Sequence, residues 1–218
     1  MKFFVDSANI DQIIRINELG LCDGVTTNPT LVSREGRGFK ETIKEICRVV
    51  KGPVSAEVVA TDAEGMLKEA REIASWADNV VIKVPMTPEG IRATRLMGRD
   101  RIRVNVTLIF SLPQALIAAK AGADFISPFV GRLDDLGFDG MDLIRDCVTM
   151  LNNYEFESEI ITASVRGAQH ITQAAVAGAH IATVPPDALL KLFNHQLTDK
   201  GIQMFEKDWQ KANLKIFD

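Results

Sequence analysis

The chain has 218 residues, 46% of them hydrophobic, and a formal net charge of −4 at pH 7. This size allows one sizeable core, and a mildly acidic balance without a basic block argues against nucleic acid as a partner. No apolar run approaches the roughly 20 residues that cross a bilayer, and three widely spaced cysteines are typical of reduced thiols. We therefore expect a cytoplasmic protein with no membrane partner.

Eight short runs rich in β-branched residues recur along the chain and predict β-strands. In order they are KFFVDS, GVTTN, PVSAEVV, NVVIKVP, RVNVTLI, FISPFV, EIITASV and IATVPP. Segments with apolar residues at helical spacing separate them, so the strands recur at the period of a βα unit. Eight such units predict an α/β fold, a closed (β/α)8 TIM barrel that forms a single domain over residues 1–218. A doubly wound open sheet is the alternative.

The helix ends and the tail carry two further signals. The triplet AGA closes two predicted helices, at residues 121–123 and 177–179, where glycine can serve as a helix C-cap. The tail predicts an additional C-terminal helix over about residues 199–213, with Ile202, Phe205 and Trp209 on one face. The eight βα units already complete the ring of helices, so this apolar stripe is additional to it. The helix is therefore expected to dock either on its own barrel or on a neighbouring subunit.

Polar residues keep one phase along the predicted strands. Residues two apart in a strand point the same way, so in RVNVTLI Asn105 and Thr107 share one face and Val104 and Val106 the other. Alternation alone is typical of a half-solvated antiparallel sheet, but here the intervening helices would cover the outside of a parallel barrel. The polar face is then the barrel interior, and active sites form at its C-terminal mouth. The predicted interior groups are Asp6, Asn28, Glu57, Lys83, Asn105, Thr107, Ser127, Ser164 and Arg166.

Lys83 is a cation within the core-like strand NVVIKVP. Burial disfavours the charged form of an amine, and a neutral amine attacks ketones to form a Schiff base, whose iminium draws electrons from a nearby C–C bond. This chemistry needs proton carriers, and Asp6 and Glu57 are the carboxylates at hand, while Thr107 could hold a water. The alternative is a structural ion pair of Lys83 with Asp6 or Glu57.

Two arginines follow the sixth and seventh predicted strands, in SPFVGRLDD and SVRGAQ. Arg132 and Arg166, together with Ser127 and Ser164, suit a dianionic phosphate because arginine binds phosphate bidentately. The two aspartates of SPFVGRLDD are interpreted as partners that orient Arg132 or as solvated charges, not as metal ligands. The three histidines lack metal-ligand spacing and are expected to be structural.

Six stretches together carry a family resemblance: VDSANI, GVTTNPTLV, SAEVVATDAEGM, VVIKVPMTPEG, the segment from NVTLIFSLPQ to SPFVGRLDDLG, and ITASVRGAQHI. They are similar to transaldolases, most closely to the small single-domain subfamily that includes fructose-6-phosphate aldolases. The resemblance implies that Lys83 forms the Schiff base, that Asp6 acts on the substrate hydroxyl during C–C cleavage, and that Glu57 and Thr107 hold the catalytic water. The implied substrate- and phosphate-binding set is Asn28, Asn105, Ser127, Phe129, Arg132, Ser164 and Arg166. No metal or organic cofactor is expected, because the lysine supplies the electrophile.

The implied reaction transfers a dihydroxyacetone unit from sedoheptulose 7-phosphate or fructose 6-phosphate to glyceraldehyde 3-phosphate or erythrose 4-phosphate, within the pentose phosphate pathway. The close alternative is an aldolase that releases free dihydroxyacetone. Such aldolases tend to carry glutamine in place of Glu57 and tyrosine in place of Phe129, so both positions favour a transaldolase. A non-catalytic barrel that binds sugar phosphates is a third hypothesis, against which the set of Lys83, Glu57 and Asp6 argues. The resemblance also implies a homo-oligomer, a decamer of two pentamers in which the C-terminal helix grips a neighbour.

Overall fold

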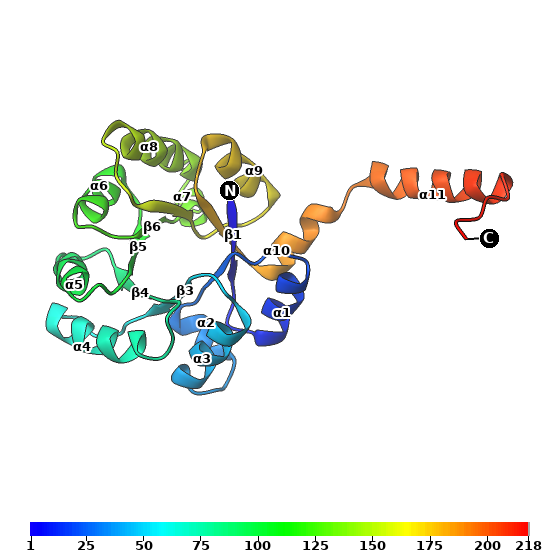
Figure 1. Cartoon of the computed structure of the whole chain (residues 1–218). Helices are drawn as coiled ribbons and strands as arrows, with labels where there is room; N and C mark the ends of the chain where they lie inside the picture. The colour runs from blue at the N-terminus through cyan, green and yellow to red at the C-terminus, as the bar shows by residue number, and fades with distance from the viewer. Residues whose placement is uncertain (218) are drawn as a thin grey trace.

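Eight parallel strands close into a barrel in which each strand pairs with the next and the last pairs with the first (Figure 1). This computed structural model describes residues 1–217, so Asp218, the end of the predicted domain, lies outside the described residues. The closed order confirms the predicted (β/α)8 TIM barrel and excludes the doubly wound open sheet. The strands are β1 (Lys2–Asp6), β2 (Gly24–Thr26), β3 (Val54–Glu57), β4 (Val80–Pro85), β5 (Val104–Ile109), β6 (Phe125–Pro128), β7 (Glu159–Thr162) and β8 (Ile181–Val184).

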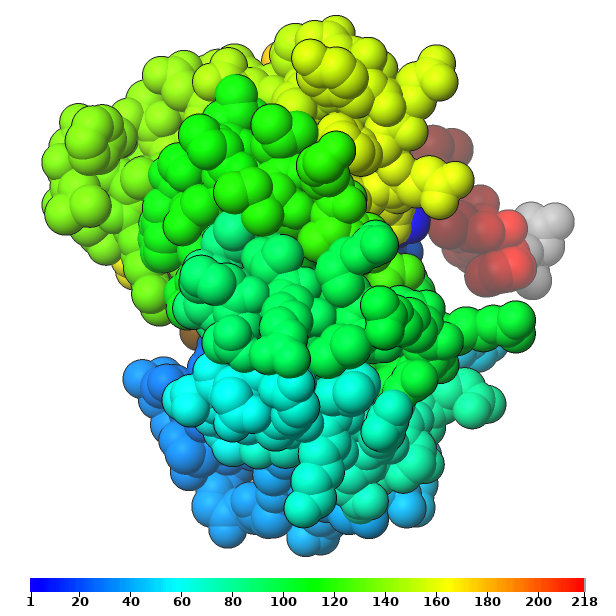
Figure 2. Space-filling model, turned by 90° about the vertical axis from the view of Figure 1, so that its left-hand side faces the viewer, coloured from blue at the N-terminus to red at the C-terminus, as the bar shows by residue number. Residues whose placement is uncertain are grey.

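Helices surround the barrel and cover the apolar outer faces of the strands (Figure 1). The flank formed by α4, α5, α6 and α8 is a continuous surface (Figure 2). The longer helices of this ring are α1 (Ile10–Glu18), α3 (Phe39–Val49), α4 (Ala63–Ala74), α5 (Pro88–Arg99), α6 (Leu112–Lys120), α8 (Gly140–Asn153) and α9 (Ala168–Ala177). Three short helices, α2 (Pro29–Arg34), α7 (Val130–Asp134) and α10 (Pro186–Leu190), follow β2, β6 and β8, and a 3₁₀ turn (Lys191–Phe193) leads to α11 (Gln196–Lys211).

Local sequence sets where these helices begin and end. Thr87 caps α5 by accepting a hydrogen bond from the Gly90 N–H, and Pro88 occupies the first turn, where a missing N–H is harmless. Gly122 and Gly178, the glycines of the two AGA triplets, both have a φ of +87°, which a residue with a Cβ adopts only at a cost. The structure therefore confirms glycine-mediated ends for α6 and α9.

The barrel interior is apolar at the N-terminal end of the strands and polar at the C-terminal end. Five interior residues form the apolar plug: Phe4, Val81, Phe125, Ile161 and Ile181. The rings of Phe4 and Phe125 meet edge to face, with their centroids 6.1 Å apart. Because this plug closes one end, any open interior space lies at the C-terminal mouth, as the polar phase predicted.

The helix α11 stands away from the barrel (Figure 1). It spans Gln196–Lys211, slightly earlier than the predicted 199–213, and none of its residues is buried. Ile202, Phe205 and Trp209 are exposed, so docking of this stripe on its own barrel does not occur in the structure. Within residues 1–217, no helix has both the length and the apolarity needed to cross a membrane.

Candidate functional site

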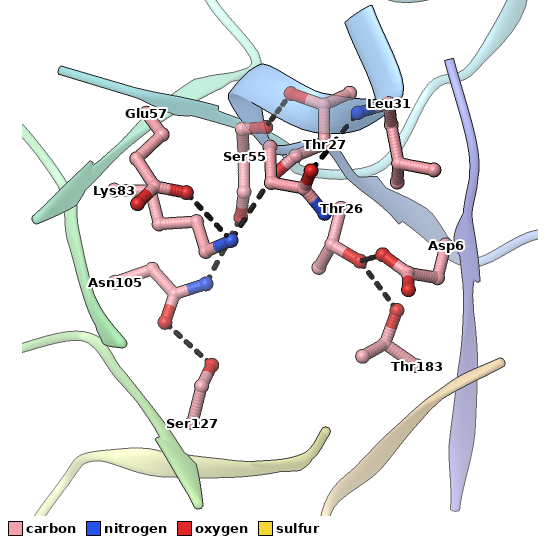
Figure 3. Close-up of polar contacts among 11 residues, drawn as sticks. Asp6, Thr26, Thr27, Leu31, Ser55, Glu57, Lys83, Asn105, Ser127 and Thr183 are labelled. Atoms are coloured by element: carbon pink, nitrogen blue, oxygen red, sulfur yellow. Dashed lines mark hydrogen bonds and ion pairs between the residues drawn. The ribbon is translucent and has the colours of Figure 1, made fainter. Parts of the chain in front are cut away.

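Lys83 points into the barrel from the middle of β4, and only 6% of its surface is exposed. Parallel pairing places its Cα beside Glu57 of β3 and Asn105 of β5. The Nζ lies 2.9 Å from Glu57 Oε2 and donates a hydrogen bond to the Thr27 carbonyl at 3.1 Å (Figure 3). The amine is therefore held by one carboxylate and one carbonyl, and the ion pair left open by the sequence forms with Glu57.

Glu57 connects the barrel interior to solvent. Its side chain remains 16% exposed and also borders a cavity of about 880 Å³ that lies outside the barrel, between the α2–α3 segment and α4. A carboxylate within 3 Å of an amine can exchange a proton with it directly, and contact with solvent lets that proton be replaced.

Asp6, at the end of β1, is the second interior carboxylate, and Figure 3 shows it on the other side of the Lys83 amine from Glu57. The Thr26 hydroxyl donates to Asp6 Oδ1 at 2.8 Å and lies 2.5 Å from the Thr183 hydroxyl. While Asp6 is ionised, the single Thr26 proton points at it, and Thr183 is then the donor to Thr26. Burial raises the pKa of Asp6, against the smaller lowering effects of the Thr26 hydrogen bond and the Lys83 charge. The two carboxylates thus have different surroundings.

A fully buried hydrogen-bonded chain crosses the interior beneath the mouth. Ser127 donates to Asn105 Oδ1 at 2.7 Å, and Asn105 Nδ2 donates to Ser55 Oγ at 3.2 Å. These contacts hold the Asn105 side chain from both sides of its amide. Asn105 is therefore rigidly placed next to Lys83.

Thr107 is buried, and its hydroxyl has no hydrogen-bond partner within the described part of the chain. Buried hydroxyls are nearly always paired, so an unpaired one that borders a cavity is suited to a water or a ligand. The next residue, Leu108, has a φ of +60°, and the β5–β6 register shifts between Val106 and Ile109. Strained backbone of this kind is concentrated at functional sites.

A small cavity of about 130 Å³ lies at the mouth, above the plug. Eight of the eleven residues predicted for the site line this cavity. The other three, Glu57, Asn105 and Arg166, do not. The lining residues are Asp6, Thr26, Asn28, Lys83, Thr107, Ser127, Phe129, Arg132, Ala163, Ser164 and Thr183.

Asn28 has a second, structural role as a helix cap, which was not predicted. Its side-chain oxygen accepts a hydrogen bond from the Leu31 N–H at 2.9 Å and thereby caps α2. The cap orients the amide, so that the NH₂ group is the part of Asn28 that can donate to a ligand in the cavity.

Phe129 and Arg132 form one wall at the rim. The Arg132 guanidinium carbon lies 5.0 Å from the centroid of the Phe129 ring. The Phe110 ring also packs against the Phe129 ring, with the two ring centroids 5.7 Å apart. The short helix α7 carries Arg132, although the sequence predicted only a loop here, because five residues are too few for helical periodicity to be visible.

The predicted place of Arg166 in the barrel interior is wrong. Strand β7 ends at Thr162, and Ser164, with a φ of +59°, turns the chain, so alternation no longer decides where side chains point. The Arg166 side chain is exposed at the rim and pairs with Asp135 at 2.7 Å. Its neighbour in space is Gly131, beside Arg132, so the two arginines still face the same edge of the mouth.

The two loop aspartates do not orient Arg132, which corrects one of the two interpretations of SPFVGRLDD. Asp135 holds Arg166, and Asp134 Oδ2 lies 2.6 Å from His170 Nε2. The second interpretation, solvated charges, fits the exposed Asp135 better than the half-buried Asp134.

Three lining residues were missed by the sequence prediction, namely Thr26, Ala163 and Thr183. Signals existed for the two threonines. Thr26 shares the phase of Asn28, and Thr183 alternates with two apolar neighbours in IATVPP. Ala163 is apolar and small, so no pattern distinguished it from the core.

Comparisons with known proteins agree with this architecture. A relative from Thermoanaerobacter sp. (strain X514), named a probable transaldolase, is 56% identical over 99% of this chain and its own full length. A probable transaldolase of Methanococcus vannielii is 59% identical over 99% of this chain and all of its own, and probable transaldolase 2 of Listeria monocytogenes is 56% identical over 99% of both.

Among solved structures, inosine 5′ monophosphate dehydrogenase from Legionella pneumophila matches with a TM-score of 0.60 and 15% identity. The match covers 85% of this chain and 58% of that one, and at this identity it reflects the shared barrel fold alone. The family model described as transaldolase/fructose-6-phosphate aldolase matches residues 3–216. The chain therefore belongs to the transaldolase/fructose-6-phosphate aldolase family.

Proposed function

We propose that the protein is a transaldolase that carries a dihydroxyacetone unit on Lys83 as a Schiff base. The observation that carries this proposal is the position of the Lys83 amine, which is buried at the cavity and lies 2.9 Å from Glu57 Oε2. An ion pair with a purely structural role would not need a polar cavity beside it. Nor would it need Asp6, a second carboxylate whose surroundings differ from those of Glu57.

The first half of the proposed reaction forms the iminium. Glu57 accepts a proton from the Lys83 ammonium, and the neutral amine then attacks the ketone carbon of the sugar phosphate. The protonated Glu57 returns its proton to the carbinolamine hydroxyl, which leaves as water. The unpaired Thr107 hydroxyl supports a role in holding that water beside Glu57.

The second half breaks the C–C bond. Asp6 accepts the proton of the hydroxyl on C4, the C3–C4 bond breaks, and its electron pair moves to the iminium to give an enamine. The aldose phosphate leaves, an acceptor aldose phosphate takes its place, and the steps run in reverse. The raised pKa of Asp6 supports this role, because a carboxyl that binds a proton readily can both take it and return it.

The remaining groups are proposed to bind the sugar phosphate. Polar contacts to substrate hydroxyls are assigned to Asn28, Asn105 and Ser127, while Phe129 forms a wall of the cavity. The phosphate is assigned to Arg132, Ser164 and Arg166 at the rim, since two arginines and a hydroxyl suit a dianion. The reaction draws on no metal or organic cofactor, because the iminium is the electron acceptor.

Incubation with fructose 6-phosphate in the absence of an acceptor tests the function. A transaldolase releases about one equivalent of glyceraldehyde 3-phosphate per site and then stops, because the dihydroxyacetone remains on Lys83. Continuous release would instead identify the alternative, an aldolase that frees dihydroxyacetone. If the folded protein released no glyceraldehyde 3-phosphate, only the third hypothesis, a non-catalytic barrel that binds sugar phosphates, would remain.

Glu57→Gln is expected to lower the transfer rate on the order of 100-fold while an adduct on Lys83 still forms. Glutamine preserves the shape of the side chain but cannot take the lysine proton. Steady-state transfer from fructose 6-phosphate to erythrose 4-phosphate measures the rate, and borohydride reduction followed by mass spectrometry measures the adduct. Glu64→Gln, on the surface of α4, is the control, and unchanged transfer in Glu57→Gln would remove Glu57 from the mechanism.

We further propose that the chain acts in the cytoplasm, in the pentose phosphate pathway, as one barrel domain over residues 1–218 that assembles into a homo-oligomer. A decamer of two pentamers is the form that the family resemblance suggests. The exposed stripe of α11 supports assembly, because Ile202, Phe205 and Trp209 present apolar surface to solvent on a helix that buries none of its residues.

Phe205→Glu is expected to weaken this assembly by a factor on the order of 30 or more, since it places a charge at the centre of an apolar contact. Sedimentation velocity over a range of protein concentrations measures the shift toward smaller species. Lys207→Ala, on the opposite face of α11, should leave the assembly unchanged. Equal sedimentation of Phe205→Glu and the parent protein would show that α11 does not hold the oligomer together.

A further inference from the structure

His170, in the first turn of α9, links two segments of the barrel mouth. Its Nδ1 accepts a hydrogen bond from the Arg166 backbone N–H at 3.1 Å, and its Nε2 lies 2.6 Å from Asp134 Oδ2 at the end of α7. The other oxygen of Asp134 accepts from the Gly140 N–H at 2.9 Å. The imidazole and the carboxylate thus form a bridge from the β7–α9 segment, through α7, to the start of α8.

The hydrogen bonds define the protonation of this bridge. A backbone N–H can only donate, so His170 Nδ1 must be the unprotonated acceptor, and the ring proton resides on Nε2, toward the carboxylate. Both nitrogens and both carboxylate oxygens are therefore occupied by protein partners. A ring committed in this way is not available as an acid or a base for a ligand, so its effect must come through the segments that it connects.

The segments it connects are packed directly against each other. The Val130 N–H donates to the Ala163 carbonyl at 3.0 Å and the Gly131 N–H to the Ser164 carbonyl at 3.1 Å. A Cβ at Gly131 would lie 2.2 Å from the Ser164 carbonyl oxygen, so only glycine permits this approach. Ser164 itself is held at a φ of +59°, a conformation that persists only where its surroundings enforce it.

The same segments carry the polar groups at the rim. Arg132 belongs to α7 and Ser164 to the β7–α9 segment, and both line the cavity. The second tie between these segments, Arg166 to Asp135, joins two exposed side chains and is therefore weak. The His170 side chain is only 13% exposed, so its contacts are the better protected ones.

We propose that His170 and Asp134 are positioning residues, which lock α7 onto the β7–α9 segment and so set the spacing of Arg132, Ser164 and Arg166. The inference rests on the proposed function in one respect, the assignment of the substrate phosphate to these three groups. It predicts that weakening the bridge impairs recognition of the phosphate and leaves the chemistry at Lys83 intact.

Two substitutions of His170 break one link each. In His170→Asn the amide oxygen falls near the former Nδ1 and keeps the Arg166 N–H bond, but the contact with Asp134 is lost. In His170→Gln the amide nitrogen falls near the former Nε2 and keeps Asp134, but the Arg166 bond is lost. Because the bridge needs both links, each variant should raise the KM for fructose 6-phosphate on the order of tenfold, with kcat within about threefold of the parent value.

A matched control lies at the opposite end of the barrel. His180 Nδ1 accepts the Ile160 N–H at 3.0 Å, a contact of the same kind, but at the N-terminal end of β7. His180→Gln should therefore leave the KM for fructose 6-phosphate unchanged. Unphosphorylated fructose is the matched substrate, and its kcat/KM should be the same in the His170 variants and in the parent enzyme.

Asp134→Asn provides a second route if the His170 variants unfold, because it disturbs the same bridge from the other side and should raise the same KM. Equal losses with fructose and fructose 6-phosphate, or a KM unchanged in every folded variant, would overturn the positioning role. Failure of the proposed function is recognised separately: the parent enzyme would then form no borohydride-reducible dihydroxyacetone adduct on Lys83.

Discussion

Lys83→Met is expected to abolish transfer, with a loss on the order of 10⁴-fold or more, and to remove the borohydride-trapped adduct. Methionine fills a similar volume but offers no nucleophile. The measurement combines steady-state transfer kinetics with peptide mass spectrometry after reduction in the presence of fructose 6-phosphate. Lys68→Met, at an exposed position of α4, is the control and should retain full activity and the adduct on Lys83.

The same substitution should also lower stability, because Glu57 would lose its partner at 2.9 Å and the Thr27 carbonyl its donor. Unpairing a largely buried charge of this kind destabilises by about 1–3 kcal/mol. The double variant Lys83→Met with Glu57→Gln removes the unpaired charge and should recover most of that loss without recovering activity. An adduct on another lysine, or retained transfer in folded Lys83→Met, would contradict the mechanism.

Asp6→Asn is expected to stop the reaction one step later, lowering transfer by about 10²–10⁴-fold. Asparagine can still accept the Thr26 hydrogen bond but cannot take the substrate proton. Schiff-base formation on Lys83 would proceed while C–C cleavage would not. Borohydride should therefore trap the whole six-carbon sugar phosphate on Lys83, where the parent enzyme yields the three-carbon adduct. A three-carbon adduct formed at the parent rate would exclude Asp6 as the base.

The stability of Asp6→Asn should change in the opposite sense to its activity. Burial raises the pKa of Asp6 in the folded state, so the folded state binds more protons than the unfolded state between the two pKa values. The contribution of Asp6 to stability is thus complete below about pH 4, the ordinary range of an aspartate, and is lost as the pH rises through the folded-state pKa.

A neutral asparagine does not undergo this loss. Urea denaturation should accordingly find Asp6→Asn at least as stable as the parent at pH 7, with its relative advantage shrinking as the pH falls toward 4. Asp11→Asn, at an exposed position of α1, tests for a general effect of removing one carboxylate. A clear destabilisation of Asp6→Asn at pH 7 would show that the carboxylate serves the fold.

Much of the site could be predicted because strand alternation is a local and strict property. The phase of Asp6, Glu57, Lys83 and Thr107 follows from their strands alone, and the structure brings all four to the polar end of the interior. Arg166 was misplaced because it lies beyond the end of β7, where a left-handed residue redirects the chain. Outside the strands, hydrogen bonds to distant segments determine the direction of side chains, and no sequence period records them.

The sequence by itself determined the eight-unit barrel, the two glycine helix ends and the face on which each polar strand residue lies, because these follow from short-range periodicity and backbone preference. Only the tertiary structure decided which carboxylate meets Lys83. Glu57 lies beside it through the β3–β4 register, whereas Asp6 is held by Thr26 of β2, which Thr183 of β8 contacts in turn. Periodicity specifies the face of the sheet on which a residue lies. It does not specify how far along the barrel axis the residue lies or which residue of the next strand is beside it, because these depend on strand register, which the packing of the whole barrel sets.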